Sequence, residues 1–120
     1  MNNLELYCMC LYDDHLENVK ALGYTPVGLG KNNFRSEWLR DNHGENISHK
    51  NPYYGEYSFY YWFWKNKLDK IEENKWIGFC HYRHHWSNQN KIKSEELNHI
   101  INEKNYSSYI LKEINPEWND

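Results

Sequence analysis

The chain has 120 residues and a mass of 14.8 kDa, which suits one compact domain with its own core. Its formal net charge is -3 and its 14 Lys and Arg residues are scattered, so we expect no nucleic-acid partner. The longest apolar run, residues 59–64, is far shorter than the ~20 residues that cross a bilayer, so we expect no transmembrane segment.

The N-terminus and the cysteines indicate a cytoplasmic protein. Residues 1–5 have neither the basic stretch nor the long apolar stretch of a signal peptide. The spacing of Cys8, Cys10 and Cys80 matches neither a zinc ribbon nor a secreted disulfide framework. We therefore expect three thiols in a reducing compartment.

The first thirty residues predict a strand, a helix and a second strand. Residues 4–12 are almost continuously apolar, which is typical of a strand buried on both faces. Residues 15–22 have helical spacing, and the acidic pair at positions 13 and 14 resembles a helix cap more than a metal-binding pair. Residues 24–29 predict the second strand, with Pro26 at its start or at a sheet edge. This order favours a βαβ unit with parallel strands.

A long loop and an aromatic helix follow. Residues 30–50 have no sustained period and predict a surface loop of a length that is usually functional. Asn51 and Pro52 then predict the N-cap and first turn of a helix over residues 53–68. We expect one aromatic stripe of this helix to face the sheet as core rather than to bind sugar: Tyr57, Tyr60, Tyr61, Trp64 and Leu68.

The last third of the chain predicts one more strand and one more helix. Residues 76–82 are rich in strand-forming side chains, and residues 87–93 predict a loop. Ser94 is expected to cap a helix with Leu97, Ile100 and Ile101 on one face, and residues 106–114 fit either a helix or a strand. The elements together predict a single α/β domain with a mostly parallel sheet and flanking helices.

The densest group of reactive side chains follows the strand at residues 76–82. His81, Tyr82, Arg83 and His84 stand where ligands bind in open α/β sheets, beyond the carboxyl end of a strand. We favour an anion site in which Arg83 and a histidine hold a phosphate. A solvated strand end and a histidine metal site are the alternatives, and no neighbouring carboxylate or second cysteine supports the metal.

A second group lies in the long loop. Asn46, Ser48 and the helix start at Asn51 can hold a hydroxyl-rich or phosphorylated ligand, or can simply build the loop and the cap. Asp41 and Glu45 are the candidates for acid–base catalysis.

Several stretches of the sequence, in order, resemble a known family. They are Pro26–Gly30, Asp41–Ser48, Lys50–Pro52, Tyr54–Glu56, Tyr61–Asn66 and Ile77–Arg83. The series is similar to domain-of-unknown-function family 4422, glycosyltransferase-like domains found with capsular and surface polysaccharide genes, over roughly residues 5–86.

The resemblance implies a GT-A-like (Rossmann-like) fold that takes a nucleotide-diphosphate sugar donor and extends a glycan acceptor. The chain is expected to be the N-terminal, nucleotide-sugar-binding part of such a domain over residues 1–120. Together with the two groups above, we expect catalytic roles for Asp41, Glu45 and His81, and substrate binding by a further set: Asn46, Ser48, Asn51, Tyr82, Arg83 and His84. Where the family has His-Tyr-Arg-Arg, this sequence has His84 in place of the second arginine. The Asp-x-Asp metal motif of GT-A enzymes is absent from the sequence, so a divalent metal cofactor is not expected from the motif. A non-catalytic nucleotide- or carbohydrate-binding module, or a fragment that needs a partner, is the alternative.

Overall fold

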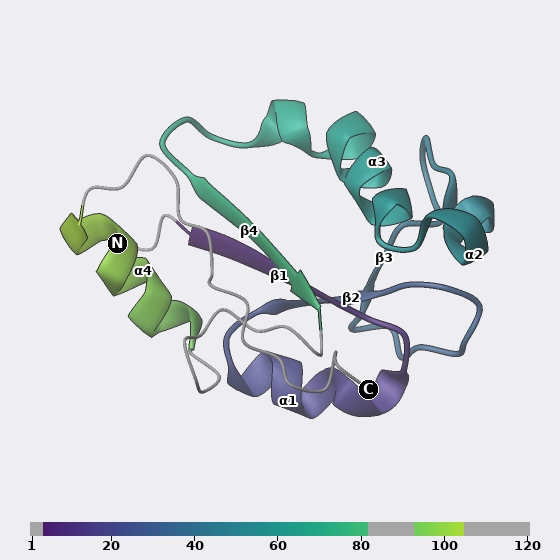
Figure 1. Ribbon diagram of the computed structural model, residues 1–120, viewed down its shortest axis with the longest axis horizontal. Helices are drawn as coiled ribbons and strands as arrows, with labels where there is room; N and C mark the ends of the chain where they lie inside the picture. The colour runs from purple at the N-terminus through teal and green to yellow at the C-terminus, as the bar shows by residue number, and fades with distance from the viewer. Residues whose placement is uncertain (1–3, 82–92, 105–120) are drawn as a thin grey trace.

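The computed structural model describes residues 4–81 and 93–104 and contains a four-stranded parallel sheet. The strands are β1 (Leu4–Cys10), β2 (Thr25–Gly28), β3 (Leu39–Arg40) and β4 (Trp76–His81), in the order β3-β2-β1-β4. Figure 1 shows the aromatic helix α3 (Tyr57–Asn66) above these strands and α1 (Leu16–Ala21) below them. The predicted α/β, Rossmann-like architecture is therefore confirmed.

The central strand β1 separates two apolar cores. Its even-numbered side chains, from Leu4 to Cys10, pack with α1 and with α4 (Ser94–Lys104). Its residues Tyr7 and Met9 pack on the opposite face, against α3. A strand covered on both faces must be apolar along its whole length, which is why residues 4–12 could be recognised in the sequence.

The β1-α1-β2 unit is parallel as predicted, but neither Asp13 nor Asp14 caps the helix α1. Among the described residues, no side chain caps the 3₁₀ turn Asp13–His15 or the helix α1 that follows. Asp13 instead accepts hydrogen bonds from the main-chain N–H of Arg35, at 2.8 Å, and from the indole N–H of Trp38, at 2.9 Å. Both donors bind Oδ1 of Asp13, so the acidic residue holds the loop after β2.

The loop after β2 contains one strand that the sequence did not reveal. Leu39 and Arg40 form β3, which pairs with Val27 and Gly28 only. Two residues are too few to show a strand period. Pro26 is the second residue of β2, in register with Cys8 of β1 and just before the two residues that pair with β3, which agrees with the predicted position at the start of the strand.

The predicted helix over residues 53–68 is broken into three pieces. They are α2 (Asn51–Tyr54), α3, and a 3₁₀ turn at Leu68–Lys70. Gly55 ends α2 with φ 57° and ψ -129°, a backbone conformation that residues other than glycine rarely adopt. The N-cap prediction for Asn51 is also wrong, because Asn51 is the first residue of α2 and its side chain donates to the Gly55 carbonyl at 2.8 Å.

The buried face of α3 differs from the predicted stripe. Trp64 is 56% exposed, and Tyr57 and Leu68 are exposed as well. Every residue from 57 to 64 except Ser58 is aromatic, so the sequence pattern does not single out one face. The residues of α3 that are buried against β1 and β2 or beneath the loop before α2 are Ser58, Phe59, Trp62 and Phe63.

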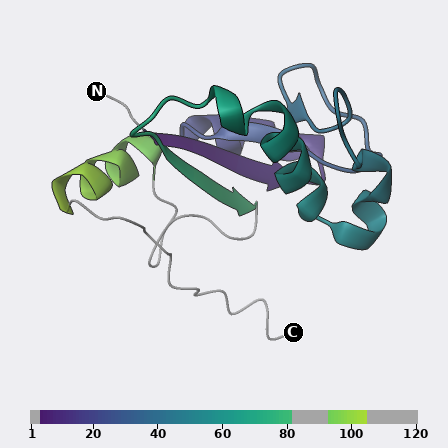
Figure 2. The same ribbon diagram turned by 90° about the horizontal axis from the view of Figure 1, so that it is seen from above.

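The strand β4 and the helix α4 are present as predicted, but Ser94, expected as the cap, is itself the first residue of α4. β4 pairs with β1 in parallel from Trp76 to His81, and α4 begins at Ser94 with Leu97 buried in the α1 core. The side chain of Ile101 and the ambiguous segment 106–114 lie outside the described residues. Figures 1 and 2 show α4 at the opposite end of the molecule from α2. Within the part of the chain described, no helix is long and apolar enough to cross a membrane.

Candidate functional site

The carboxyl ends of all four strands meet at one edge of the sheet, because every neighbouring pair is parallel. The chain runs from β1 to β2 and β3 on one side and then crosses to β4 on the other side of β1. In open α/β sheets, ligands bind outside the point where the strand order reverses. The ends of β1 and β4, at Cys10 and His81, therefore mark the candidate site.

A carboxylate and an imidazole meet at this edge. The Nε2 atom of His81, the last residue of β4, lies 2.6 Å from Oε2 of Glu56, at the bend between α2 and α3. Both side chains are about one-third exposed, so the pair is open to solvent and held by the fold. A carboxylate fixes the orientation of an imidazole and stabilises its protonated form, as catalytic dyads do.

Glu56 is a site residue that the sequence analysis missed. A glutamate at the start of a helix is favoured by the helix dipole alone, so this position by itself does not indicate a site. The available signal was the Tyr54–Glu56 stretch, one of the family-like stretches, as is the Ile77–Arg83 stretch that contains His81. The structure brings these two stretches into direct contact.

Two tyrosines of α3, Tyr57 and Tyr60, form ring contacts near the Glu56–His81 pair. The rings of Tyr57 and Tyr60 meet edge to face at 5.6 Å, and Tyr60 packs edge to face on Phe79 of β4 at 5.1 Å. Burial, with smaller contributions from Glu56 and Tyr57, raises the pKa of Tyr60 to about 12. The Tyr60 hydroxyl therefore stays protonated at neutral pH.

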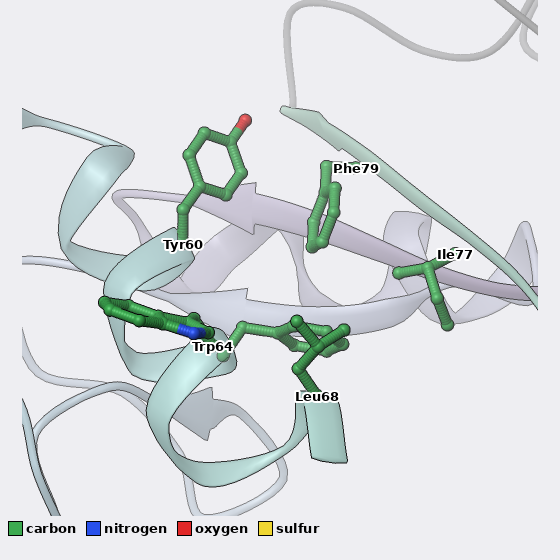
Figure 3. Close-up of a pocket in the computed structure, with 6 residues that line it drawn as sticks. Tyr60, Trp64, Leu68, Ile77 and Phe79 are labelled. Carbon is green, nitrogen blue, oxygen red and sulfur yellow. The ribbon is translucent and has the colours of Figure 1, made fainter. Parts of the chain in front are cut away.

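An apolar hollow of about 260 Å³ lies between α3 and β4. Figure 3 shows Trp64 and Leu68 on one side and Ile77 and Phe79 on the other, with the Tyr60 hydroxyl pointing away from Trp64 and Leu68. Tyr60 therefore contributes its ring to the apolar hollow.

Asp41, the first predicted catalytic residue, lies in a buried hydrogen-bond network. Asp41 is 1% exposed, and its Oδ2 accepts a hydrogen bond from the Ser58 hydroxyl at 2.7 Å. The Ser58 oxygen in turn accepts a hydrogen bond from the Asn51 side chain at 3.0 Å. This network connects the loop after β3 to α2 and α3. Its geometry gives Asp41 and Asn51 a structural role.

Glu45, the second predicted acid–base residue, lies on the outer side of α3. Its Oε2 accepts a hydrogen bond from the Tyr61 hydroxyl at 2.9 Å and lies 3.7 Å from the Lys65 ammonium. That hydrogen bond raises the pKa of Tyr61. The Glu45 carboxylate is exposed, whereas that of Asp41 is turned inward to Ser58, so the structure does not bring the two into one acid–base pair.

Asn46 and Ser48 contact each other within the loop. The Asn46 Oδ1 accepts hydrogen bonds from the main-chain N–H of Ser48, at 3.2 Å, and from its hydroxyl, at 3.1 Å. The Asn46 amide also donates to the Gly44 carbonyl at 2.9 Å. This local turn corresponds to the predicted alternative in which these residues build the loop.

A comparison with protein-family models assigns the chain to one family. The family model described as Domain of unknown function (DUF4422) matches residues 7–115. The chain belongs to the DUF4422 family. No curated protein and no solved structure matches it. The resemblance seen in the sequence is thus confirmed at the level of the family.

Two of the three arginines of this DUF4422 domain have partners within the fold. The Arg35 side chain contacts Asp13 at 2.8 Å and Glu17 at 2.9 Å. The main-chain N–H of Arg35, and then its side chain, lowers the pKa of Asp13, and the side chain lowers the pKa of Glu17. Arg40 donates to the carbonyls of Gly28, at 2.6 Å, and Gly30, at 2.7 Å. Both guanidinium groups hold the loop after β2.

The other predicted ligand-binding residues follow β4 directly. Tyr82, Arg83 and His84 lie outside the described residues, and their predicted roles stay predictions. Because His81 ends β4 at the carboxyl edge, Arg83 follows that edge by two residues in the chain.

The cysteines of the DUF4422 domain belong to its core. All three are buried thiols, and Cys8 and Cys80 are direct partners in the β1–β4 register. A hydrogen bond with Cys8, together with burial, raises the pKa of the Cys10 thiol. Such thiols pack as small apolar side chains rather than as nucleophiles.

Proposed function

We propose that this DUF4422 domain transfers a sugar from a nucleotide-diphosphate sugar to a surface or capsular glycan acceptor, at the carboxyl edge of its sheet. The observation that carries the proposal is the Glu56–His81 pair at the end of β4, beside the reversal of strand order. Nucleotides bind at this point in Rossmann-like sheets. The reaction type comes from the glycosyltransferase-like character that the sequence motifs imply.

The proposed reaction needs a proton acceptor. The acceptor hydroxyl attacks the anomeric carbon of the donor sugar, the bond from that carbon to the diphosphate breaks, and the hydroxyl proton must leave. Glu56 and His81 form a pair that takes up such a proton, with the carboxylate stabilising the imidazolium that results. His81 is thus the predicted catalytic residue that the geometry favours.

The reaction also needs positive charge beside the leaving diphosphate. We assign this role to Arg83, helped by His84 and with Tyr82 in the same ligand-binding segment, because a guanidinium binds phosphate through two parallel hydrogen bonds. The internal contacts of Arg35 and Arg40 support this choice among the three arginines. We propose no metal cofactor and a cytoplasmic location, on the sequence grounds given above.

A panel of nucleotide sugars tests the function in two stages. Thermal unfolding with each nucleotide sugar identifies the donor, because a ligand that binds only the folded state raises the melting temperature. Release of the nucleoside diphosphate then measures turnover. Binding without release would identify a binding module or a fragment that needs a partner, and no binding by any donor would overturn the proposal.

A further inference from the structure

The polar pair at the end of β4 lies beside an aromatic ring that is both exposed and fixed. Tyr57 is 65% exposed, on the helix whose other face is buried against the sheet. Its edge-to-face contact with Tyr60, and that of Tyr60 with Phe79, connect it to β4 through two ring pairs. Aromatic pairs of this geometry hold their rings in place.

The same ring lies close to hydrogen-bonding groups. Glu56 precedes Tyr57 at the helix start and contacts His81 at 2.6 Å. Phe79 and His81 are two residues apart on β4, so their side chains lie on the same face of the strand, where Phe79 packs on Tyr60 and His81 contacts Glu56. The Tyr57–Tyr60 ring pair and the Glu56–His81 pair therefore lie next to each other between the start of α3 and the end of β4.

Such a surface matches the chemistry of a sugar. One face of a pyranose ring presents C–H groups, which pack on an aromatic ring, while its hydroxyl groups form hydrogen bonds with carboxylates and imidazoles at the rim. An extended apolar ligand would instead match the hollow lined by Trp64, Leu68, Ile77 and Phe79, where charged groups are not among the lining residues described. The mixed character of the Tyr57 surface favours a carbohydrate.

We infer that Tyr57 is the stacking platform of the acceptor subsite: a pyranoside packs on its ring with a hydroxyl toward Glu56 and His81. This inference rests on the proposed function and adds to it the place where the acceptor sugar binds. Tyr60 positions the platform through their ring contact.

The test uses methyl glycosides of glucose, galactose and N-acetylglucosamine as probes, with binding followed by two-dimensional amide NMR on the full chain. Replacing Tyr57 with Ser is expected to weaken binding of the preferred glycoside on the order of tenfold, because the stacked ring is lost. Tyr57→Phe keeps the ring and is expected to bind within about twofold of the parent.

Tyr53 supplies a matched control. It is 85% exposed on α2, so Tyr53→Ser removes an even more exposed ring four residues away and is expected to leave glycoside binding unchanged. Equal binding by Tyr57→Ser and the parent, an equal loss in Tyr53→Ser, or no glycoside binding by the parent would each overturn the inference. Nucleotide-sugar binding, measured on the same samples, tests the proposed function separately, since Tyr57→Ser is expected to retain it.

Discussion

The carboxylate of Asp41 accepts a hydrogen bond from the Ser58 hydroxyl at 2.7 Å inside the protein, where both residues are almost fully buried. The bond joins the loop after β3 to the inner face of α3. A buried carboxylate that loses a hydrogen-bond donor bears the full cost of its desolvation.

We therefore expect Ser58→Ala to lower the free energy of unfolding by about 2–3 kcal/mol. Urea denaturation followed by tryptophan fluorescence measures this change. Ser48→Ala removes a hydroxyl from the half-exposed Asn46 turn and serves as the control, with an expected loss below about 1 kcal/mol. Equal losses in the two variants would show that the Asp41 network contributes no special stability.

Two tryptophans of α3 give a matched test of which helix face is buried. Trp62 is 2% exposed and its indole N–H donates to the His43 carbonyl, whereas Trp64 is 56% exposed. Trp62→Ala is expected to cost about 3–5 kcal/mol and Trp64→Ala less than about 1 kcal/mol, by thermal or urea unfolding. The reverse order would restore the stripe expected from the sequence.

Below neutral pH, the dependence of the free energy of unfolding on pH is expected to reflect the ionisation of Asp13. The main-chain N–H of Arg35, with the side chains of Trp38 and Arg35, lowers the pKa of this carboxyl group. The stabilisation is therefore fully present above the unfolded pKa of ~3.9 and is lost as the pH falls through the lower folded value. Urea unfolding between pH 7 and pH 2.5 should show parent and Asp13→Asn converging below about pH 4. A stability difference that stays constant with pH would contradict this.

Arg83→Lys is expected to weaken nucleotide-sugar binding while the folding stability stays the same. A lysine keeps the charge but replaces the two-pronged guanidinium by a single ammonium. Titration calorimetry and thermal unfolding together measure both properties. Arg35→Lys is the control with the opposite outcome, since Arg35 contacts Asp13 and Glu17: a lower stability and an unchanged affinity. Unchanged affinity in Arg83→Lys would remove this arginine from the donor site.

Chelation tests the predicted independence from metal ions. Nucleotide-sugar affinity is expected to survive treatment with EDTA, because the sequence has no Asp-x-Asp motif and the oxygens of Asp13 are engaged by Arg35 and Trp38. A loss of binding that manganese restores would establish a metal-dependent donor site.

The sequence by itself determined the elements whose environment is uniform along their length. β1 has apolar residues almost throughout, because it is covered on both faces, and the β1-α1-β2 unit and β4 could be recognised for similar reasons. The family followed from ordered motifs, and His81 was placed at a strand end because that strand was recognised. These properties depend on neighbours in the chain.

Only the tertiary structure decided features that depend on neighbours in space. The buried face of α3 was ambiguous because nearly all of its residues are aromatic, and contacts with β1 and with Asp41 select Phe59 and Ser58. Asp13 turned from a predicted cap into a partner of Arg35, a residue 22 positions away. Glu56 and His81 are 25 positions apart in the sequence, and they meet because of the bend at Gly55 and the crossover to β4. The periodicity of the sequence does not predict such contacts, because they arise from the packing of whole helices and strands.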